Sequence, residues 1–404
     1  MERARQPKIF LIFPLFPEET IAPFGIGVKA TPFGWPSASL DSEADRRWPE
    51  HGKEPRKTGL TGPTPSGMSD PAGTLSAMSH STPPVALTAA PPYELALSVR
   101  AMSGFAPCAG EQQVSAGTVR KAVALTGGRA VVAEIGPAGG GVSLVVHSAG
   151  PVTASEHQEV ATSVSRWLSL ADDPTSFLAS ARADPAMAPV LAETEGLHQL
   201  RFVSVAEGAC YFVLAQRTSQ VQAGGRKRRL AGVYGPVLEL DGTSYRAFPT
   251  LDRLAGLTVG ELAPFTANLR QSEYLAAVLD RLASWPAEWG YQAPTNQLLA
   301  ELRRVRGVGE FTASGIALRV FGRLDVVPAP LPAFTRAIDA LYGPGVSMSD
   351  LAARYGDQIG LWGYHVRTGL SWLGDPGGAG RDAPVSLARA GSSARTPQRH
   401  RRAG

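Results

Sequence analysis

Apolar and polar residues recur along this chain with two different periods, and the change between them divides it into two regions. Over residues 93–169, alternating segments and short apolar runs dominate, which is typical of strands mixed with helix. From Asp172 to about residue 373, apolar residues recur every three or four positions, the spacing of amphipathic helices. The pattern therefore predicts an α+β fold, with a mixed domain over residues 92–170 and a helical domain over residues 171–373.

Three strands and one helix are predicted in the first region. Residues 93–99 alternate between apolar and polar, the period of a half-buried strand. Residues 131–135 and 142–146 form two further apolar runs, and the three consecutive glycines at 139–141 predict the turn between them. Residues 115–125 have a helical spacing instead.

The second region reads as a series of helices with recognisable ends. Asp184 followed by Pro185 predicts a capped helix start with proline in its first turn, and Gly196 predicts that helix's end. Further helices are predicted over residues 205–214, 220–234, 261–285 (one or two helices), 294–305, 310–321, 331–342 and 349–373.

The two ends of the chain lack a sustained period. Residues 1–91 are rich in proline, so we expect them to be disordered, or to be an upstream extension from a misassigned start codon, with Met68 or Met78 as the true start. Residues 374–404 are rich in glycine, serine and arginine and are expected to form a flexible basic tail.

Charge changes this picture little. The chain of 404 residues has 39 basic and 35 acidic side chains, and its excess of four positive charges equals that of the tail alone. A nucleic-acid-binding face must therefore come from local clustering, such as Arg226-Lys227-Arg228-Arg229.

Two cysteines, Cys108 and Cys210, are too few to hold an iron–sulfur cluster and do not suggest a disulfide framework. No apolar run reaches the length needed to cross a bilayer, so no membrane partner is expected. These features fit a protein of the reducing cytoplasm.

The most informative stretch is a five-residue turn, residues 305–309, between the helices predicted over 294–305 and 310–321. Gly307 and Gly309 permit a tight backbone and the close approach of a ligand. The second helix begins there, so its free N–H groups and positive dipole end suit an anion such as a phosphate. The alternative is an ordinary packing corner between two helices.

The ordered run around this turn resembles the DNA-binding hairpin of the helix-hairpin-helix DNA glycosylase superfamily and, within it, the 3-methyladenine DNA glycosylase II branch. The matching residues are Leu302, Val305, Gly307, Val308, Gly309, Thr312, Ala313, Leu318, Arg319 and Gly322 to Val326. The resemblance extends over residues 92–373. It implies an antiparallel-sheet domain before the helical bundle, a monomer that binds double-stranded DNA independently of sequence, and an enzyme that flips out and excises damaged bases.

The same resemblance implies roles for individual residues. Those expected to hold DNA are Val305, Gly307, Val308, Gly309, Thr312, Gln216 and Arg217. Backbone carbonyls expected to bind a monovalent cation, the one cofactor implied, belong to Arg303, Val305 and Val308. Side chains expected to line the base pocket are Phe311, Trp362 and Tyr364. Arg217 stands where the family has a wedge, usually apolar, and the alternative for it is a surface arginine.

The implied chemistry has one gap. Phe311 occupies the position of the Schiff-base lysine of bifunctional relatives, so we expect a monofunctional enzyme. Leu331 occupies the position of the catalytic aspartate, and a leucine cannot stabilise the developing sugar cation. Glu310, Asp325 and Asp339 are candidate substitutes. The alternatives left open are an enzyme with impaired catalysis, a catalytically inactive protein that binds damaged DNA, and the product of a damaged gene.

Overall fold

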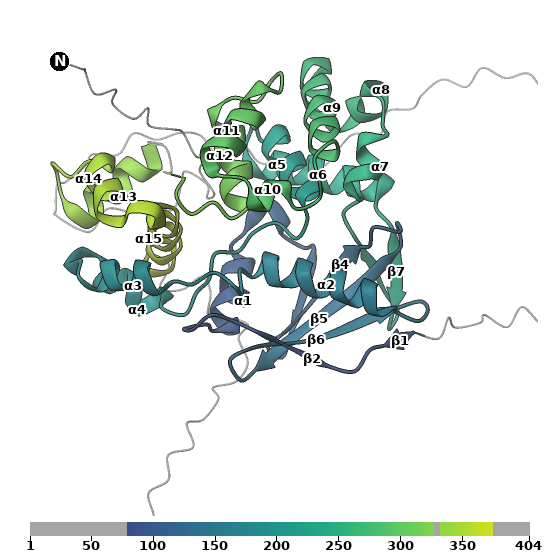
Figure 1. Ribbon diagram of the computed structural model, residues 1–404, viewed down its shortest axis with the longest axis horizontal. Coiled ribbons are helices and arrows are strands. Elements are labelled where there is room, and N and C mark those ends of the chain that lie inside the picture. Colours follow the sequence, from purple (N-terminus) through teal and green to yellow (C-terminus); the bar gives the residue numbers. More distant parts are fainter. Residues whose placement is uncertain (1–78, 327–331, 375–404) are drawn as a thin grey trace, which may run out of the picture. The chain divides into compact units, whose positions relative to one another are not determined.

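The computed structural model describes residues 79–326 and 332–374 (Figure 1). Its first part is one antiparallel sheet with the strand order β1-β6-β5-β4-β3, in which β2 also pairs with β6. The strands are β1 (His80–Ser81), β2 (Val85–Thr88), β3 (Gln112–Ser115), β4 (Thr118–Ala124), β5 (Ala130–Ala138) and β6 (Gly141–Ser148). Many helices follow, so the predicted α+β fold class is confirmed.

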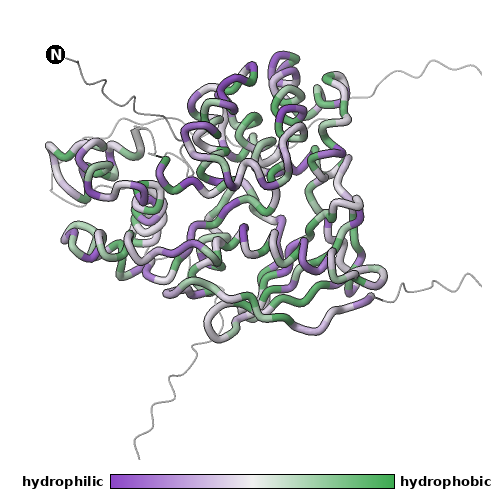
Figure 2. Tube along the Cα trace, viewed as in Figure 1, coloured by the Kyte–Doolittle hydropathy of each residue, from purple (hydrophilic) through white to green (hydrophobic). Residues whose placement is uncertain are grey.

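The sheet is covered on both faces. Apolar residues of β4, β5 and β6 pack against helices α1 (Leu95–Ser103) and α2 (Ala154–Trp167) in one core. A second, smaller core joins the opposite face to the hairpin of β7 (Val237–Leu240) and β8 (Thr243–Arg246). Figure 2 colours β5 and β6 largely as hydrophobic, as expected for strands buried on two sides.

Two predicted elements in this region are wrong. Residues 93–99 were predicted as a strand, but Leu95–Ser103 is helix α1, whose buried side chains Leu95, Ser98 and Met102 follow a helical spacing. Residues 115–125 were predicted as a helix, but Thr118–Ala124 is strand β4. Pairing with β3 on one side and β5 on the other outweighs the local helical spacing there.

The two strands of residues 131–135 and 142–146 are confirmed as parts of β5 and β6, with Gly140 in the left-handed region (φ 74°) of the turn between them. The expectation that residues up to 91 lack structure is wrong for β1 and β2, which pair with β6. Residues 1–78 and 375–404 lie outside the described residues.

The helical part contains two cores. One is formed chiefly by α5 (Val205–Leu214), α6 (Gln220–Tyr234), α9 (Leu269–Ala283), α11 (Thr295–Arg304) and α12 (Glu310–Arg319). The other is formed by α3 (Thr175–Arg182), α4 (Ala188–Thr194), α13 (Pro332–Tyr342), α14 (Met348–Tyr355) and α15 (Ile359–Leu373). Shorter helices are α7 (Leu251–Ala255), α8 (Val259–Leu262) and α10 (Trp289–Gln292).

Most of the helices predicted in this part are confirmed, most closely α5 and α6, but residues 349–373 form parts of two helices, α14 and α15, separated at Gly356. Asp184 caps a 3-10 turn, Pro185–Met187, that leads into α4, and Gly196 follows the end of that helix with φ 98°. Among the helices that the structure describes, we find none with the length and apolar character required to cross a membrane.

Candidate nucleic-acid interface

The hairpin between α11 and α12 requires a glycine at position 307. The two helices lie side by side (Figure 1), and the chain reverses between them with Gly307 at φ 86°, a left-handed conformation that favours glycine. A Cβ atom on Gly307 would also lie 2.1 Å from Cγ of the Tyr274 ring. Both the backbone conformation and the packing of Tyr274 therefore exclude a side chain here.

Gln216 connects this hairpin to the turn between α5 and α6. Its side-chain amide nitrogen donates to the carbonyl of Gly307 and to Oγ1 of Thr312, both at 2.9 Å. Thr312 is 1% exposed, so these bonds are largely shielded from water. Gln216 thus fixes the position of the hairpin loop relative to the first turn of α12.

Arg217 follows directly and is exposed. Its backbone is left-handed (φ 53°), which is uncommon for a residue with a side chain. The turn therefore presents a long cationic side chain beside the residue that contacts the hairpin. Whether Arg217 acts as a wedge stays a prediction.

The start of α12 is open to an approaching ligand. Its N-cap, Gly309, has no side chain to bond the first N–H groups, and nothing lies within 4 Å of the position of a Cβ atom there. The carbonyl of Val305 accepts from the N–H of Val308 at 3.0 Å and keeps its second lone pair, which fits the predicted cation contact. The cation site, with Arg303 and Val308, stays a prediction.

An aromatic face begins at Phe311 in the first turn of α12. Phe311 is half-buried and meets Phe212 of α5 edge to face, with ring centroids 5.8 Å apart. One turn further on, Gly315 leaves no open space, because the Phe212 ring fills it: a Cβ atom on Gly315 would lie 2.3 Å from that ring.

The other two predicted pocket residues are packed into the protein. Trp362 has no exposed surface and lies in the core of α13, α14 and α15, where its Nε1 donates to the hydroxyl of Tyr342 at 2.9 Å. Tyr364 is half-buried, its hydroxyl accepts from the N–H of Leu200 at 3.3 Å, and burial raises its pKa. The described contacts of Trp362 are those of a core residue, and the pocket roles of Phe311 and Tyr364 stay predictions.

The comparisons with known proteins agree with this architecture. The solved 3-methyladenine DNA-glycosylase from Archaeoglobus fulgidus shares the fold with a TM-score of 0.58, over 70% of this chain and 97% of its own, at 20% identity. The DNA-3-methyladenine glycosylase of Bacillus subtilis (strain 168) is 28% identical over 171 residues, 42% of this chain and 56% of its own. The chain is thus similar in sequence to one DNA-3-methyladenine glycosylase and shares the fold of another.

A third similar protein is the probable bifunctional transcriptional activator/DNA repair enzyme AlkA of Mycobacterium tuberculosis (strain CDC 1551 / Oshkosh). It is 36% identical over 166 residues, 41% of this chain and 33% of its own. The chain thus spans about half the length of the Bacillus relative and a third of the mycobacterial one. No protein-family profile matches it.

Leu331, which was predicted to stand at the catalytic position, lies outside the described residues. The three acids considered as substitutes have other neighbours. Glu310 pairs with Arg303, Asp325 accepts from Oγ1 of Thr295 at 2.9 Å, and Asp339 is exposed. None of these three acids has a described hydrogen bond or ion pair with Phe311 or Trp362, two of the predicted pocket residues.

A different carboxylate, Asp184, is linked to Trp362. The Tyr342 hydroxyl accepts from the indole and donates to Oδ2 of Asp184 at 3.0 Å, and Tyr355 donates to the same oxygen at 2.8 Å. Burial raises the pKa of Asp184, but the hydrogen bonds from Tyr355, Arg354 and Tyr342 outweigh it and lower that pKa below its usual value. Asp184 is therefore a charged structural group already held by several donors. From the sequence, Asp184 was predicted only as a helix cap.

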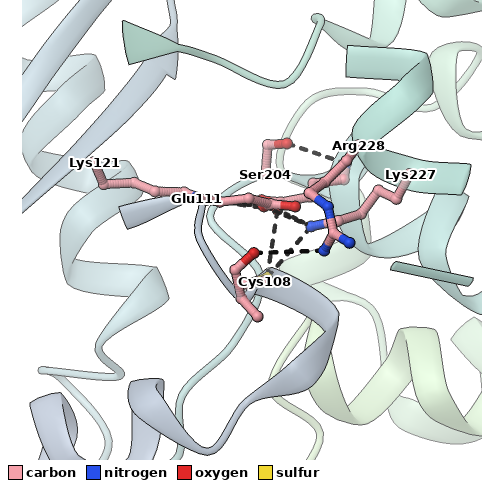
Figure 3. A network of polar contacts seen from close by, with 8 residues as sticks. Cys108, Glu111, Lys121, Ser204, Lys227 and Arg228 are labelled. Atoms are coloured by element: carbon pink, nitrogen blue, oxygen red, sulfur yellow. Dashed lines mark hydrogen bonds and ion pairs between the residues drawn. The ribbon is translucent and has the colours of Figure 1, made fainter. Parts of the chain in front are cut away.

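A buried ionic cluster lies at the junction of the sheet and the helices (Figure 3). Lys227 of α6 contacts Glu207 at 2.5 Å, Glu111 at 2.8 Å and the Cys108 sulfur at 3.3 Å, while Lys121 of β4 reaches Glu111 at 3.3 Å. Cys108, Glu111 and Glu207 are close enough to hold a metal ion, but two ammonium groups already neutralise the two carboxylates. Burial also raises the pKa of the Cys108 thiol to about 12, which disfavours a thiolate ligand. The arrangement fits an internal salt-bridge cluster better than a metal site.

This cluster corrects one expectation. The basic run 226–229 was predicted as a local cluster for a DNA-binding face, but Lys227 is fully buried. Arg228 and Arg229 are exposed, and Arg228 donates to the carbonyl of Ala109 at 3.4 Å. One helix face therefore carries the buried ammonium and another carries the exposed guanidinium groups.

Proposed function

We propose that this protein is a DNA repair protein of the DNA glycosylase type, which binds double-stranded DNA through the α11–α12 hairpin and excises alkylated bases. The observation that carries the proposal is the bond from Gln216 to the Gly307 carbonyl. This hydrogen bond holds the glycine-containing turn in one conformation. The start of α12, which has no side-chain cap, follows directly after that turn. Backbone N–H groups at such a helix start suit a phosphate, and phosphate contacts are independent of base sequence.

Arg217 is proposed as the group that enters the duplex when a base is flipped out. Its exposed guanidinium is planar and can stack on a neighbouring base while it balances phosphate charge. Its position next to Gln216 places it beside the hairpin that would hold the backbone. Flipping costs a few kcal/mol of unstacking, which such contacts offset.

The reaction is proposed to be hydrolysis without lyase activity, because Phe311 stands at the position of the Schiff-base lysine. Phe311 offers a partly exposed aromatic surface on which a flipped base could stack. With Leu331 in the sequence at the catalytic position, excision would depend on a base that departs readily. The second candidate function, favoured by that leucine, is binding of damaged DNA without excision.

Two measurements test these proposals. First, binding is measured to a duplex with a tetrahydrofuran abasic site and to the matching undamaged duplex; no preference for the damaged duplex would reject both candidates. Second, released bases are measured by chromatography after incubation with methylated DNA, for the natural protein and Leu331→Asp. Release by the natural protein supports the enzyme. Release by Leu331→Asp alone supports the binding protein, and a fragmented DNA strand would contradict the absence of lyase activity.

A further inference from the structure

A cavity of about 290 Å³ lies where the β3–β4 hairpin, helix α6 and strand β8 meet. All three elements contribute lining residues, and Phe248, which follows β8, adds an aromatic ring. The residues proposed to hold DNA are not among its described lining residues. A cavity of this size suits a small molecule, not a second stretch of duplex DNA.

The walls of this cavity are joined to one another by hydrogen bonds. The Tyr245 hydroxyl of β8 donates to Oε1 of Gln113 of β3 at 2.5 Å. The Arg228 guanidinium of α6 donates at 3.4 Å to the carbonyl of Ala109, in the segment before β3. The cavity is therefore formed before a ligand arrives, which lowers the entropic cost of binding.

Positive charge predominates on the lining. It contains three cations, Lys121, Arg228 and Arg246, and one acid, Glu111, so three minus one leaves an excess of two positive charges. Glu111 already contacts Lys121 at 3.3 Å and Lys227 at 2.8 Å (Figure 3). The two guanidinium groups are therefore left to an anion that comes from outside, and guanidinium geometry suits a phosphate.

Neither guanidinium group is fully used by the protein itself. Arg228 and Arg246 are both exposed, and the hydrogen bonds described for them go to backbone carbonyls, those of Ala109 and of Gly235 at 3.0 Å. A guanidinium has five N–H donors, so each of the two keeps several for a ligand.

The rest of the lining offers other kinds of contact. Lys121 is 6% exposed; burial lowers its pKa, but the carboxylates of Glu207 and Glu111 outweigh burial and raise that pKa, so this group stays an ammonium. Oε1 of Glu111 and Oε1 of Gln112 have no hydrogen-bond partner among the described residues. Phe248 is partly buried and presents an aromatic face. A well-matched ligand therefore carries an anion, N–H or O–H donors, and a flat ring.

We propose that this cavity binds a nucleoside monophosphate, at a site separate from the hairpin. The phosphate accepts from Arg228 and Arg246, the base stacks on Phe248, and a donor of the base or sugar reaches Gln112. A sugar phosphate lacks the ring and a nucleoside lacks the charge, so each of them uses only part of the site. The inference does not depend on base excision, because excision is proposed to act through the hairpin.

The test measures the binding of adenosine 5′-monophosphate, adenosine and ribose 5-phosphate to the full chain by calorimetric titration at one salt concentration. We expect saturable binding of the nucleotide, and at least about tenfold weaker binding of the other two, which lose either the charge-assisted hydrogen bonds or the stacked base. Arg228→Gln and Arg246→Gln should each weaken nucleotide binding by about fivefold or more. A saturating duplex with a tetrahydrofuran abasic site should leave the nucleotide affinity unchanged.

Arg229→Gln is the matched control, because Arg229 is an exposed arginine of the same helix that does not belong to the lining. It should leave nucleotide binding unchanged. The inference is overturned by a lack of saturable nucleotide binding, by equal affinity for adenosine or ribose 5-phosphate, or by unchanged affinity in both lining variants. An equal loss in Arg229→Gln, or displacement of the nucleotide by the abasic-site duplex, would reject this cavity as the site. None of these results changes the DNA-binding comparison that tests the proposed function, so the two can fail separately.

Discussion

The side-chain amide of Gln216 donates a 2.9 Å hydrogen bond to the backbone carbonyl of Gly307, 91 positions further along the chain. A second bond of the same length reaches Thr312. The α5–α6 turn and the hairpin, which are distant in sequence, are thus locked together by one side chain. The hairpin that is proposed to bind the DNA backbone and Arg217, the proposed wedge, would therefore move together.

Gln216→Ala removes both bonds and leaves the Gly307 carbonyl without this donor. We expect a loss of about 1–3 kcal/mol in unfolding free energy and a larger relative loss of DNA affinity, because the loop loses its fixed conformation. Urea unfolding and binding titrations measure the two effects. Gln222→Ala, which removes an exposed bond to Thr218, is the control and should change neither. Undiminished affinity in Gln216→Ala would show that the bond does not organise the interface.

The two hairpin glycines should respond differently to alanine. At Gly307 a Cβ atom meets the Tyr274 ring and a left-handed backbone, so Gly307→Ala should destabilise the protein by about 1–3 kcal/mol. At Gly309 the backbone is ordinary (φ −86°) and the space is open, so Gly309→Ala should cost under about 1 kcal/mol. Thermal unfolding of both variants measures the contrast, which disappears if the hairpin has another conformation.

Lys227→Met should be among the most damaging single changes in the helical part, because it leaves the buried Glu207 short of a counter-charge. We expect a loss of about 3–5 kcal/mol, partly recovered in the double variant with Glu207→Leu. Arg228→Met, on the exposed side of the same helix, is the control and should cost little. Denaturant unfolding of the natural protein, the two single buried variants, the double variant and Arg228→Met provides the comparison. Full additivity of the two buried changes would contradict the coupling.

His365 is expected to make the free energy of unfolding depend on pH below about 6.5. Its ring stacks on Phe177 and contacts Oγ1 of Thr194 at 2.9 Å, and burial lowers its pKa to about 3. The unfolded chain binds the proton at about pH 6.5, so the neutral ring stabilises the folded state above that pH. Stability should fall by up to about 1.4 kcal/mol per pH unit as the pH drops from 6.5 toward 3. His365→Gln should flatten this slope between pH 7 and 5, while the exposed His80→Gln should not.

Sequence predicted the helices best where a local signal marks their ends. Ser204 and Ser219 cap α5 and α6 by accepting from the N–H groups of Glu207 and Gln222, so both starts were placed correctly. Strand β4 was predicted as a helix and helix α1 as a strand. Short segments can satisfy both periods, and only strand pairing or side-chain packing decides between them. The β7–β8 hairpin was missed although Asp241-Gly242, both at positive φ, is a strong turn signal.

In the candidate site, too, features with a local sequence signal could be predicted and features that depend on distant residues could not. The hairpin's position follows from its glycines and flanking helices, which are local features. The filling of the space at Gly315 by Phe212, and the burial of Trp362, depend on side chains from other helices and have no local signature. Tyr274 likewise gains its role only because it lies against Gly307 in space.

The ionic cluster around Lys227 has a practical consequence for dissecting the protein. Its two lysines and two glutamates are divided between the sheet region and the helices: Glu111 and Lys121 come from one side, Glu207 and Lys227 from the other. A fragment that begins near residue 171 would keep one opposite pair but expose it to solvent along a newly bared apolar surface. Such a truncated helical fragment should aggregate when expressed alone, and the sheet region should be retained in any minimal version of the protein.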